Sequence, residues 1–356
     1  MTRILLSLTA LLPMLAILPS RAAEAVPVEV TNIRRVFHNG EHNAFTDLIR
    51  WRDRLWLTFR SCPGGHAVFS TSRIIVLASD DEGKSWDTVH EFSVPDRDTR
   101  DPHFLAFRGK LFVYTGTWYA GPGEEQLPRE QYDLNKHLGY AVFSEDGTSW
   151  SEPHALEGTY GHYIWRAASH DGRAYLCGRR KKDHSENESG AGAPRIVQSA
   201  LLESDDGLVW RYRSLFQENR GDETAFHFFP DGRLLGLSRS GSAPAHLVRS
   251  RPPYETWDRR ELSEYVGGPL LAKWGDRFLA GGRRSTGDGP VTQLYWLIDD
   301  TLVPCAQLPS GGDNSYPGFV SFDDQRGLVS WYSSHERDES GEVITAIYLA
   351  DLAVSE

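Results

Sequence analysis

A strand–turn–strand unit recurs six times along the chain, and this repeat constrains the fold more than any other feature of the sequence. Each copy has an apolar strand, a polar turn that carries Gly or Asp, and a second apolar strand. The copies occupy residues 45–59, 101–114, 163–177, 223–237, 268–280 and 316–331. Polar turns between period-2 or fully buried strands indicate β-hairpins.

The spacing of the copies indicates how the hairpins are assembled. Their second strands are about 40 to 65 residues apart, which suits a four-stranded propeller blade with outer loops of variable length. Residues 28–37 and 343–352 are also strand-like, and we expect them to pair and close the ring, which removes an exposed sheet edge. The sequence therefore predicts an all-β, six-bladed β-propeller of four-stranded antiparallel blades over residues 26–356.

The N-terminus has the pattern of a secretory signal. Arg3 precedes an apolar run over residues 4–18, and small-residue cleavage patterns follow at residues 20–22 and 23–25. The run is too short for a stable membrane span. We therefore expect a signal peptide over residues 1–25, a secreted or periplasmic protein, and no membrane span after signal removal.

Composition narrows the class of partner. The net charge of −11 argues against nucleic acid or an anionic membrane surface. Cys62, Cys177 and Cys305 allow at most one disulfide, and the sequence leaves open whether any two of them pair. No CxxC pair or His-rich ligand spacing is present, so we expect no metal and no cofactor. We also expect a monomer.

A second pattern lies between the hairpin units. Residues 79–86 have the form S-x-D-x-G-x-S-W, and residues 144–150 and 204–210 are shortened versions. In such a turn the Asp accepts from backbone N–H groups, the Gly adopts positive φ, and the Trp packs between neighbouring sheets. We interpret these turns as structural and assign them no chemistry.

Repeated turns of this kind, called Asp boxes or BNR repeats, in a six-unit β chain resemble the sialidase (neuraminidase) superfamily. Residues 223–239 are similar to the family's strand pair in which a Glu partners the nucleophile and a closing Arg binds the substrate carboxylate; here these are Glu223 and Arg239. Residues 313–320 resemble the stretch with the family's tyrosine nucleophile, here Tyr316. Arg283 stands where a further carboxylate-binding Arg is expected. The resemblance covers about residues 40–335.

The resemblance implies an exo-sialidase-like glycoside hydrolase that cleaves a terminal sialic acid or related acidic sugar by a retaining mechanism. The anomeric carbon of sialic acid carries a carboxylate that would repel a carboxylate nucleophile, whereas a tyrosine activated by glutamate avoids this repulsion. Arginine binds a carboxylate through two parallel hydrogen bonds. Glu223 and Arg239 leave one end of a hairpin, and Tyr316 begins the matching strand of the sixth unit, so all three are expected at one rim.

The sequence departs from the family pattern at two positions. Thr46 stands where family members carry an arginine in the first blade, and the following loop, residues 60–67, contains no carboxylate to act as the acid/base. Arg60 is a candidate for the missing positive charge. Asp47 and His66 are candidates for the proton donor.

Further polar and aromatic residues open the second and third units. They are the substrate-binding candidates Arg100, Asp101, His162, Trp165 and Arg166. Their ordinary structural roles stay open: Asp101 before a proline can cap a strand, and Trp165 alternates as in any strand. Two other functions also stay open, a non-catalytic glycan-binding propeller and a lyase or hydrolase that acts on uronates through Tyr and His. In each case the expected partner is an acidic glycan, whose sugar and linkage the sequence does not specify.

Overall fold

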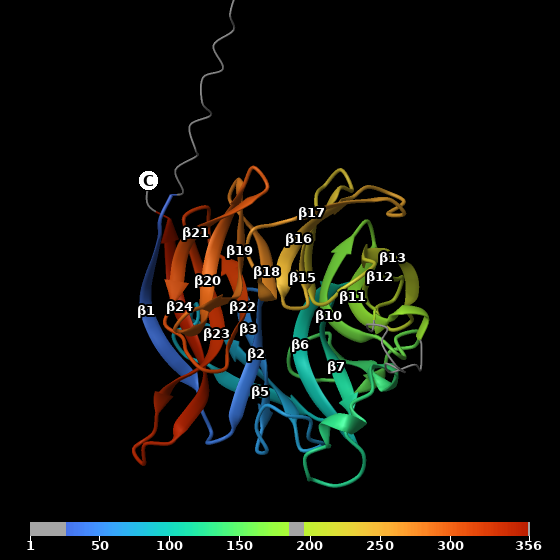
Figure 1. Ribbon diagram of the computed structural model, residues 1–356. Helices are drawn as coiled ribbons and strands as arrows, with labels where there is room; N and C mark the ends of the chain where they lie inside the picture. Colours follow the sequence, from blue (N-terminus) through green and yellow to red (C-terminus); the bar gives the residue numbers. More distant parts are fainter. Residues whose placement is uncertain (1–25, 185–195, 355–356) are drawn as a thin grey trace, which may run out of the picture.

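The computed structural model describes residues 26–184 and 196–354, and the expected signal peptide lies outside this range. The described chain forms six four-stranded antiparallel sheets (Figure 1). Its helical content is limited to single turns of 3-10 helix, η1 (Arg129–Gln131), η2 (Leu134–Lys136) and η3 (Lys182–His184). The prediction of an all-β, six-bladed propeller is confirmed.

In five of the blades the four strands follow one another in the chain, beginning with the innermost. The first blade contains β2 (His42–Trp51), β3 (Arg54–Cys62), β4 (Arg73–Ser79) and β5 (Asp87–Phe92). The second contains β6 (Arg97–Phe107), β7 (Lys110–Tyr119), β8 (Leu138–Ser144) and β9 (His154–Ala155). The third contains β10 (Tyr163–His170), β11 (Arg173–Lys181), β12 (Val197–Ser204) and β13 (Arg211–Gln217). The next two contain β14 (Thr224–Phe228), β15 (Leu234–Ser240), β16 (Ala243–Ser250) and β17 (Trp257–Glu261), then β18 (Gly267–Trp274), β19 (Arg277–Thr286), β20 (Gly289–Ile298) and β21 (Thr301–Leu308).

The sixth blade joins the two ends of the described chain. It contains β22 (Asn314–Ser321), β23 (Arg326–Arg337), β24 (Val343–Val354) and β1 (Val28–Phe37). Strands β1 and β24 are antiparallel, with Val28 opposite Val354 and Phe37 opposite Ile347. The predicted closure of the ring is confirmed.

The six sequence repeats correspond to the two innermost strands of the six blades. Their first strands β2, β6, β10, β14, β18 and β22 contact one another around the ring. Large apolar side chains fill the spaces between the sheets, including the fully buried Trp56, Trp274, Trp296 and Trp331. This packing holds the inner strands in place, so side chains at their ends are presented from a rigid frame.

The Asp-box turns have the expected structure. The Asp206 carboxylate accepts from the backbone N–H groups of Leu208 (2.8 Å) and Val209 (2.9 Å), and Gly207 has a φ of 85°. The Trp210 ring packs edge-on against Tyr114 of the neighbouring blade, with ring centroids 5.6 Å apart. These turns therefore fix blade-to-blade packing.

The three cysteines are free thiols in the structure. Cys62 and Cys177 are buried and Cys305 is partly buried. Within residues 26–184 and 196–354, no helix has the length and apolar character needed to cross a membrane.

Candidate active site

Bulges in the inner hairpins aim the candidate site residues. The pairing of the first two strands shifts register near the start of the first strand in five blades, between Ala44 and Asp47, Arg100 and His103, Ile164 and Ala167, Gly267 and Leu270, and Ser315 and Gly318. A bulge turns a side chain away from the regular alternation of a strand. Four residues within these bulges have positive φ, namely Phe45, Asp101, Gly268 and Tyr316.

The centre of the site is a hydrogen bond between two buried side chains from different blades. The Tyr316 hydroxyl donates to Oε1 of Glu223 at 2.5 Å. Burial and the adjacent Glu223 charge raise the pKa of Tyr316 well above its usual value, so the phenol is neutral. Burial alone would raise the pKa of Glu223, but Arg239 and the hydrogen bond from Tyr316 hold it below its usual value. Glu223 is therefore an ionised base beside a neutral phenol.

Backbone and side-chain donors fix the other oxygen of Glu223. Oε2 accepts from Nη1 of Arg239 (2.9 Å) and from the backbone N–H of Gly268 (3.1 Å). Gly268 has a φ of 59°, and a Cβ at this position would lie 2.6 Å from the Tyr316 ring. Only glycine allows this close approach without displacing the tyrosine.

Two arginines flank the Tyr316–Glu223 pair. The backbone N–H of Arg239 donates to the Glu223 carbonyl (2.9 Å), and its Nη1 lies 3.5 Å from the Tyr316 hydroxyl oxygen. The guanidinium carbon of Arg283 lies 5.7 Å from the centroid of the Tyr316 ring, and its Nη2 donates to Asp313 (2.9 Å) and Tyr332 (2.8 Å). The structure thus brings together the four residues Tyr316, Glu223, Arg239 and Arg283.

Asp101 is a carboxyl group that holds its proton more strongly than usual. Its Oδ2 accepts from the hydroxyl of Tyr163, whereas its buried Oδ1 has no hydrogen-bond partner among the described residues. Burial and the negative charge of Glu223 raise the pKa of Asp101 to about 6. A carboxyl group with a raised pKa in a site is suited to proton donation.

Arg60 is a buried structural arginine. Its side chain is 0 % exposed, and Nε and Nη2 bond both oxygens of Asp98 at 3.0 and 3.1 Å. Arg100 bonds the same carboxylate and the backbone carbonyls of His66 (2.8 Å) and Ala67 (2.9 Å). Because Asp98 carries one negative charge, it neutralises only one of these two guanidinium groups. The guanidinium carbon of Arg100 also lies 5.6 Å from the centroid of the Phe45 ring.

Asp47 and Arg166 form an ion pair inside the ring of inner strands. Arg166 Nη1 bonds Asp47 Oδ1 (2.9 Å), and its other nitrogens donate to the carbonyls of Pro269 (3.0 Å) and Pro317 (2.7 Å). Burial alone would raise the pKa of Asp47, but Arg166 and His103 hold it below its usual value. These contacts join the first, third, fifth and sixth blades.

The remaining sequence candidates lie in different surroundings. The buried Trp165 ring lies 6.2 Å from that of Tyr316 and 4.9 Å from that of His103. His162 contacts His184 and the carbonyl of Tyr160, and burial lowers its pKa to about 4. His66 lies on the loop between β3 and β4 and bonds Asp313, which also bonds Arg283.

Sequence reasoning missed Asp313, Tyr332, Asp98 and His42 as contributors to this region. One signal in the sequence marks three of the bulges but none of these four residues, because a proline directly follows Asp101, Gly268 and Tyr316 at the start of three inner strands. Proline cannot donate to a strand ladder and is confined to edges, strand starts and bulges.

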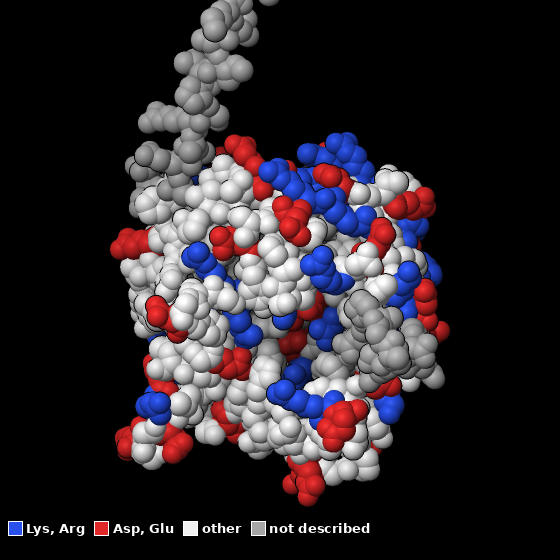
Figure 2. All heavy atoms as spheres, in the orientation of Figure 1, with Lys and Arg blue, Asp and Glu red and all other residues white. Residues whose placement is uncertain are grey.

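Charged side chains gather in a hollow of the surface. Figure 2 shows this hollow near the middle of one face, with acidic and basic side chains on its walls. A hollow with fixed charges of both signs suits a polar ligand better than an apolar one.

No family model and no curated protein sequence matches the chain, whereas solved structures do. A protein of unknown function from Dyadobacter fermentans DSM 18053 is 19% identical, with 92% of this chain and 100% of that chain covered and a TM-score of 0.75. The phage phi92 endosialidase is 12% identical over 91% of this chain and 69% of that chain, with a TM-score of 0.64.

Trypanosoma rangeli sialidase, solved with the inhibitor DANA, is 12% identical and has a TM-score of 0.61. The match covers 91% of this chain and 59% of the sialidase, so the chain spans little more than half the length of that enzyme. At this level of identity the likeness concerns the fold. Over 91% of its length the chain is structurally similar to sialidases, as an all-β propeller of six four-stranded blades.

Proposed function

We propose that this protein is an exported glycoside hydrolase that removes a terminal sialic acid or related acidic sugar with retention of configuration. The observation that carries the proposal is the buried 2.5 Å hydrogen bond from Tyr316 to Glu223, with Arg239 and Arg283 beside it. A neutral phenol paired with an ionised carboxylate is the arrangement that a substrate with an anomeric carboxylate requires. Export rests on the N-terminal sequence alone.

In the proposed first step, the Tyr316 oxygen bonds to the anomeric carbon and its proton passes to Oε1 of Glu223. The bond from the anomeric carbon to the leaving oxygen breaks at the same time, and that oxygen takes a proton from a general acid. Water then attacks the anomeric carbon and gives one proton to the deprotonated general acid, the bond to Tyr316 breaks, and the Tyr316 oxygen takes its proton back from Glu223. Splitting one displacement into two lowers the barrier of each.

Arg239 and Arg283 are proposed to bind the substrate carboxylate. Each is held in place by an acidic side chain, Glu223 and Asp313 respectively, while its own side chain stays 22% exposed. Arginine held in advance loses little conformational freedom when it binds a carboxylate.

Asp101 is the proposed proton donor. Its pKa of about 6 keeps much of it protonated in mildly acidic solution, and Oδ1 is not committed to another group in the described structure. Asp47 was the carboxylate candidate from the sequence, but its lowered pKa and its bond to Arg166 favour the ionised form, which cannot donate a proton.

The test is hydrolysis of a fluorogenic sialoside beside a panel of uronate-containing oligosaccharides, with the wild type, Tyr316→Phe and Tyr295→Phe. We expect the wild type to turn over a sialoside and Tyr316→Phe to lose at least about 10³-fold in kcat with its affinity for the sugar retained. Tyr295 is a buried tyrosine of the fifth blade whose removal is expected to leave turnover unchanged. Equal turnover in wild type and Tyr316→Phe would exclude Tyr316 as the nucleophile.

A second candidate function, glycan binding without catalysis, is favoured by the first blade. At the position where the resemblance implies a third arginine, the Thr46 hydroxyl donates to the Tyr316 carbonyl (2.8 Å), and the neighbouring Phe45 ring lies 4.9 Å from the Tyr316 ring. If the protein only binds glycans, calorimetry should show that the wild type binds the acidic sugar and binds its carboxyl-reduced analogue at least about tenfold more weakly. The wild type should then hydrolyse neither sugar. The same panel therefore separates the two functions.

A further inference from the structure

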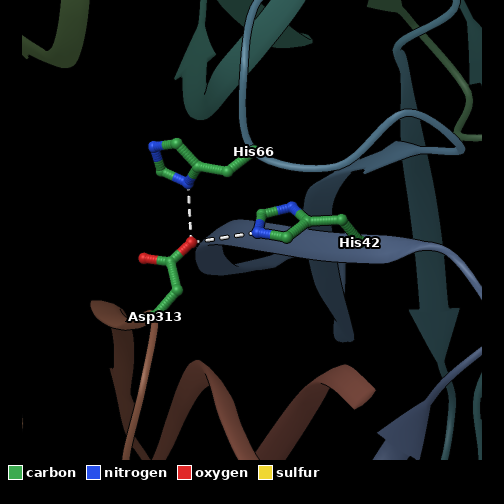
Figure 3. Close-up of side chains that lie close together, drawn as sticks. All are labelled: His42, His66 and Asp313. Carbon is green, nitrogen blue, oxygen red and sulfur yellow. Dashed lines mark hydrogen bonds and ion pairs between the residues drawn. The ribbon is translucent and has the colours of Figure 1, made fainter. Parts of the chain in front are cut away.

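Two histidines and an aspartate from three distant segments converge beside the candidate active site. His42 is the first residue of β2, His66 lies on the loop between β3 and β4, and Asp313 directly precedes β22. Figure 3 shows both imidazole rings directed at one carboxylate oxygen. That oxygen, Oδ2 of Asp313, lies 2.9 Å from Nε2 of His42 and 2.6 Å from Nδ1 of His66.

The three atoms that a metal ion could use as ligands lie close together. They all lie within 4.8 Å of one another. A zinc ion about 2.0–2.2 Å from imidazole nitrogen and carboxylate oxygen needs tetrahedral ligands that are about 3.3–3.5 Å apart. To admit the ion, the distance to the carboxylate oxygen would have to lengthen by roughly 0.5 Å for the His42 nitrogen and by roughly 0.8 Å for the His66 nitrogen. His66 can make this movement because its side chain is 53% exposed and lies on a loop.

The second oxygen of Asp313 is already held by other groups. Oδ1 accepts from Nη2 of Arg283 (2.9 Å) and from the Tyr332 hydroxyl (2.8 Å). Hydrogen bonds to the outer oxygen of a ligating carboxylate are the usual means of orienting it toward a metal. Asp313 thus presents Oδ2, with its remaining lone pairs, to the two imidazoles.

We propose that His42, His66 and Asp313 bind a divalent transition-metal ion of the zinc class at the edge of the candidate active site. Two imidazoles and one carboxylate make a three-ligand set that suits zinc and its neighbours and leaves a further coordination position for water or substrate. The ion would bind one oxygen of Asp313 while Arg283 bonds the other oxygen of the same carboxylate. A divalent cation would therefore lie next to the arginine that is proposed to bind the substrate carboxylate. The site stands on its own geometry and does not depend on the proposed hydrolase activity.

The test uses the whole protein, stripped of metal with a chelator and titrated with Zn²⁺ by calorimetry. Wild type is compared with His66→Ala and with His38→Ala, a nearby exposed histidine outside the cluster. We expect one equivalent of Zn²⁺ bound by wild type and by His38→Ala, and binding at least about tenfold weaker in His66→Ala, because a lost ligand costs no less than a lost outer-sphere contact. Co²⁺ in place of Zn²⁺ is expected to give visible absorption bands in wild type that His66→Ala lacks.

Two results would overturn the proposal. One is a wild-type protein that binds no stoichiometric Zn²⁺ at neutral pH, which would show that the three residues form a hydrogen-bonded cluster alone. The other is equal Zn²⁺ affinity in wild type and His66→Ala, which would place the ion elsewhere. Because His66 is half exposed, its replacement should not unfold the protein, and unchanged circular dichroism of the variant verifies this.

Discussion

Two buried aspartates show how position in the fold changes the chemistry of a residue. Asp101 and Asp47 are both buried near the ring of inner strands. Burial and the charge of Glu223 raise the pKa of Asp101 to about 6, whereas Arg166 holds the pKa of Asp47 below its usual value although burial alone would raise it. The two aspartates therefore differ in charge in mildly acidic solution, and only Asp101 has a proton to give.

The raised pKa of Asp101 predicts a pH-dependent gain in stability for Asp101→Asn. The folded protein binds this proton more tightly than the unfolded chain, so the contribution to stability is complete below about pH 4 and is lost as the pH rises through about 6. A shift of about two pKa units corresponds to about 3 kcal/mol. Relative to wild type, the free energy of unfolding of Asp101→Asn should therefore increase by up to this amount between pH 4 and pH 8, as measured by denaturant titration.

The same variant tests proton donation. Asn cannot donate a proton, so turnover of a glycoside with a poor leaving group should fall much more than turnover of an aryl glycoside whose leaving group needs none. An equal loss on both substrates, or a stability difference that is independent of pH, would contradict this account of Asp101.

Residue roles were predictable from sequence where the partners lie in one hairpin. Glu223 and Arg239 begin and end a strand pair, so their proximity followed from antiparallel pairing. The roles of Arg60 and Asp47 depend on Asp98 and Arg166, which belong to other blades. Nothing in the local sequence of an arginine reveals whether a carboxylate from elsewhere will bury and neutralise it.

At the level of elements, regular and irregular features of the hairpins differ in how well the sequence encodes them. The period-2 pattern and the polar turns predicted the inner hairpins, because side-chain alternation follows directly from strand geometry. The bulges that aim Asp101 and Tyr316 left no such periodic signal. The only local sign of these bulges in the sequence is the proline that follows Asp101 and Tyr316. A proline cannot donate a ladder hydrogen bond, but it does not determine the direction in which the chain turns.

The Asp-box turns should contribute to stability and not to activity. Asp206→Ala removes the acceptor for the N–H groups of Leu208 and Val209, and we expect a loss of about 1 kcal/mol or more in the free energy of unfolding, as for the loss of a helix N-cap. Burial alone would raise the pKa of Asp206, but these hydrogen bonds hold it below its usual value. The contribution to stability is therefore present above the usual pKa of an aspartate and is lost as the pH falls through the lowered pKa of Asp206 in the folded protein.

Asp205, which directly precedes Asp206 in the same turn, provides a matched control for the Asp206→Ala experiment. Asp205 bonds the exposed side chain of Arg211 at the surface, so Asp205→Ala should change stability by less than about 0.5 kcal/mol. Thermal and denaturant unfolding of both variants measure the difference. Equal effects of the two substitutions would mean that the turn does not depend on its backbone acceptor.

At the scale of the whole molecule, the ring depends on a strand from each end of the described chain. Strand β24 lies between β23 and β1, so deletion of residues 343–356 removes the partner of both. We expect this truncation to abolish the cooperative unfolding transition of the entire propeller, because the sixth blade closes the packing between the first and the fifth. Removal of residues 355–356 alone is the control, and a truncated protein with an unchanged melting curve would contradict the closure.

The pairing of β1 with β24 also sets the order of events during synthesis. The first of these strands leaves the ribosome roughly 300 residues before its partner, and joining ends so far apart carries a loop-closure cost of about 5 kcal/mol unless the intervening blades have already formed. The first five blades can therefore form in succession, but the propeller remains an open arc until β24 has been made. The closed ring is the first state in which β1 has its partner, so the propeller cannot close before β24 has been made.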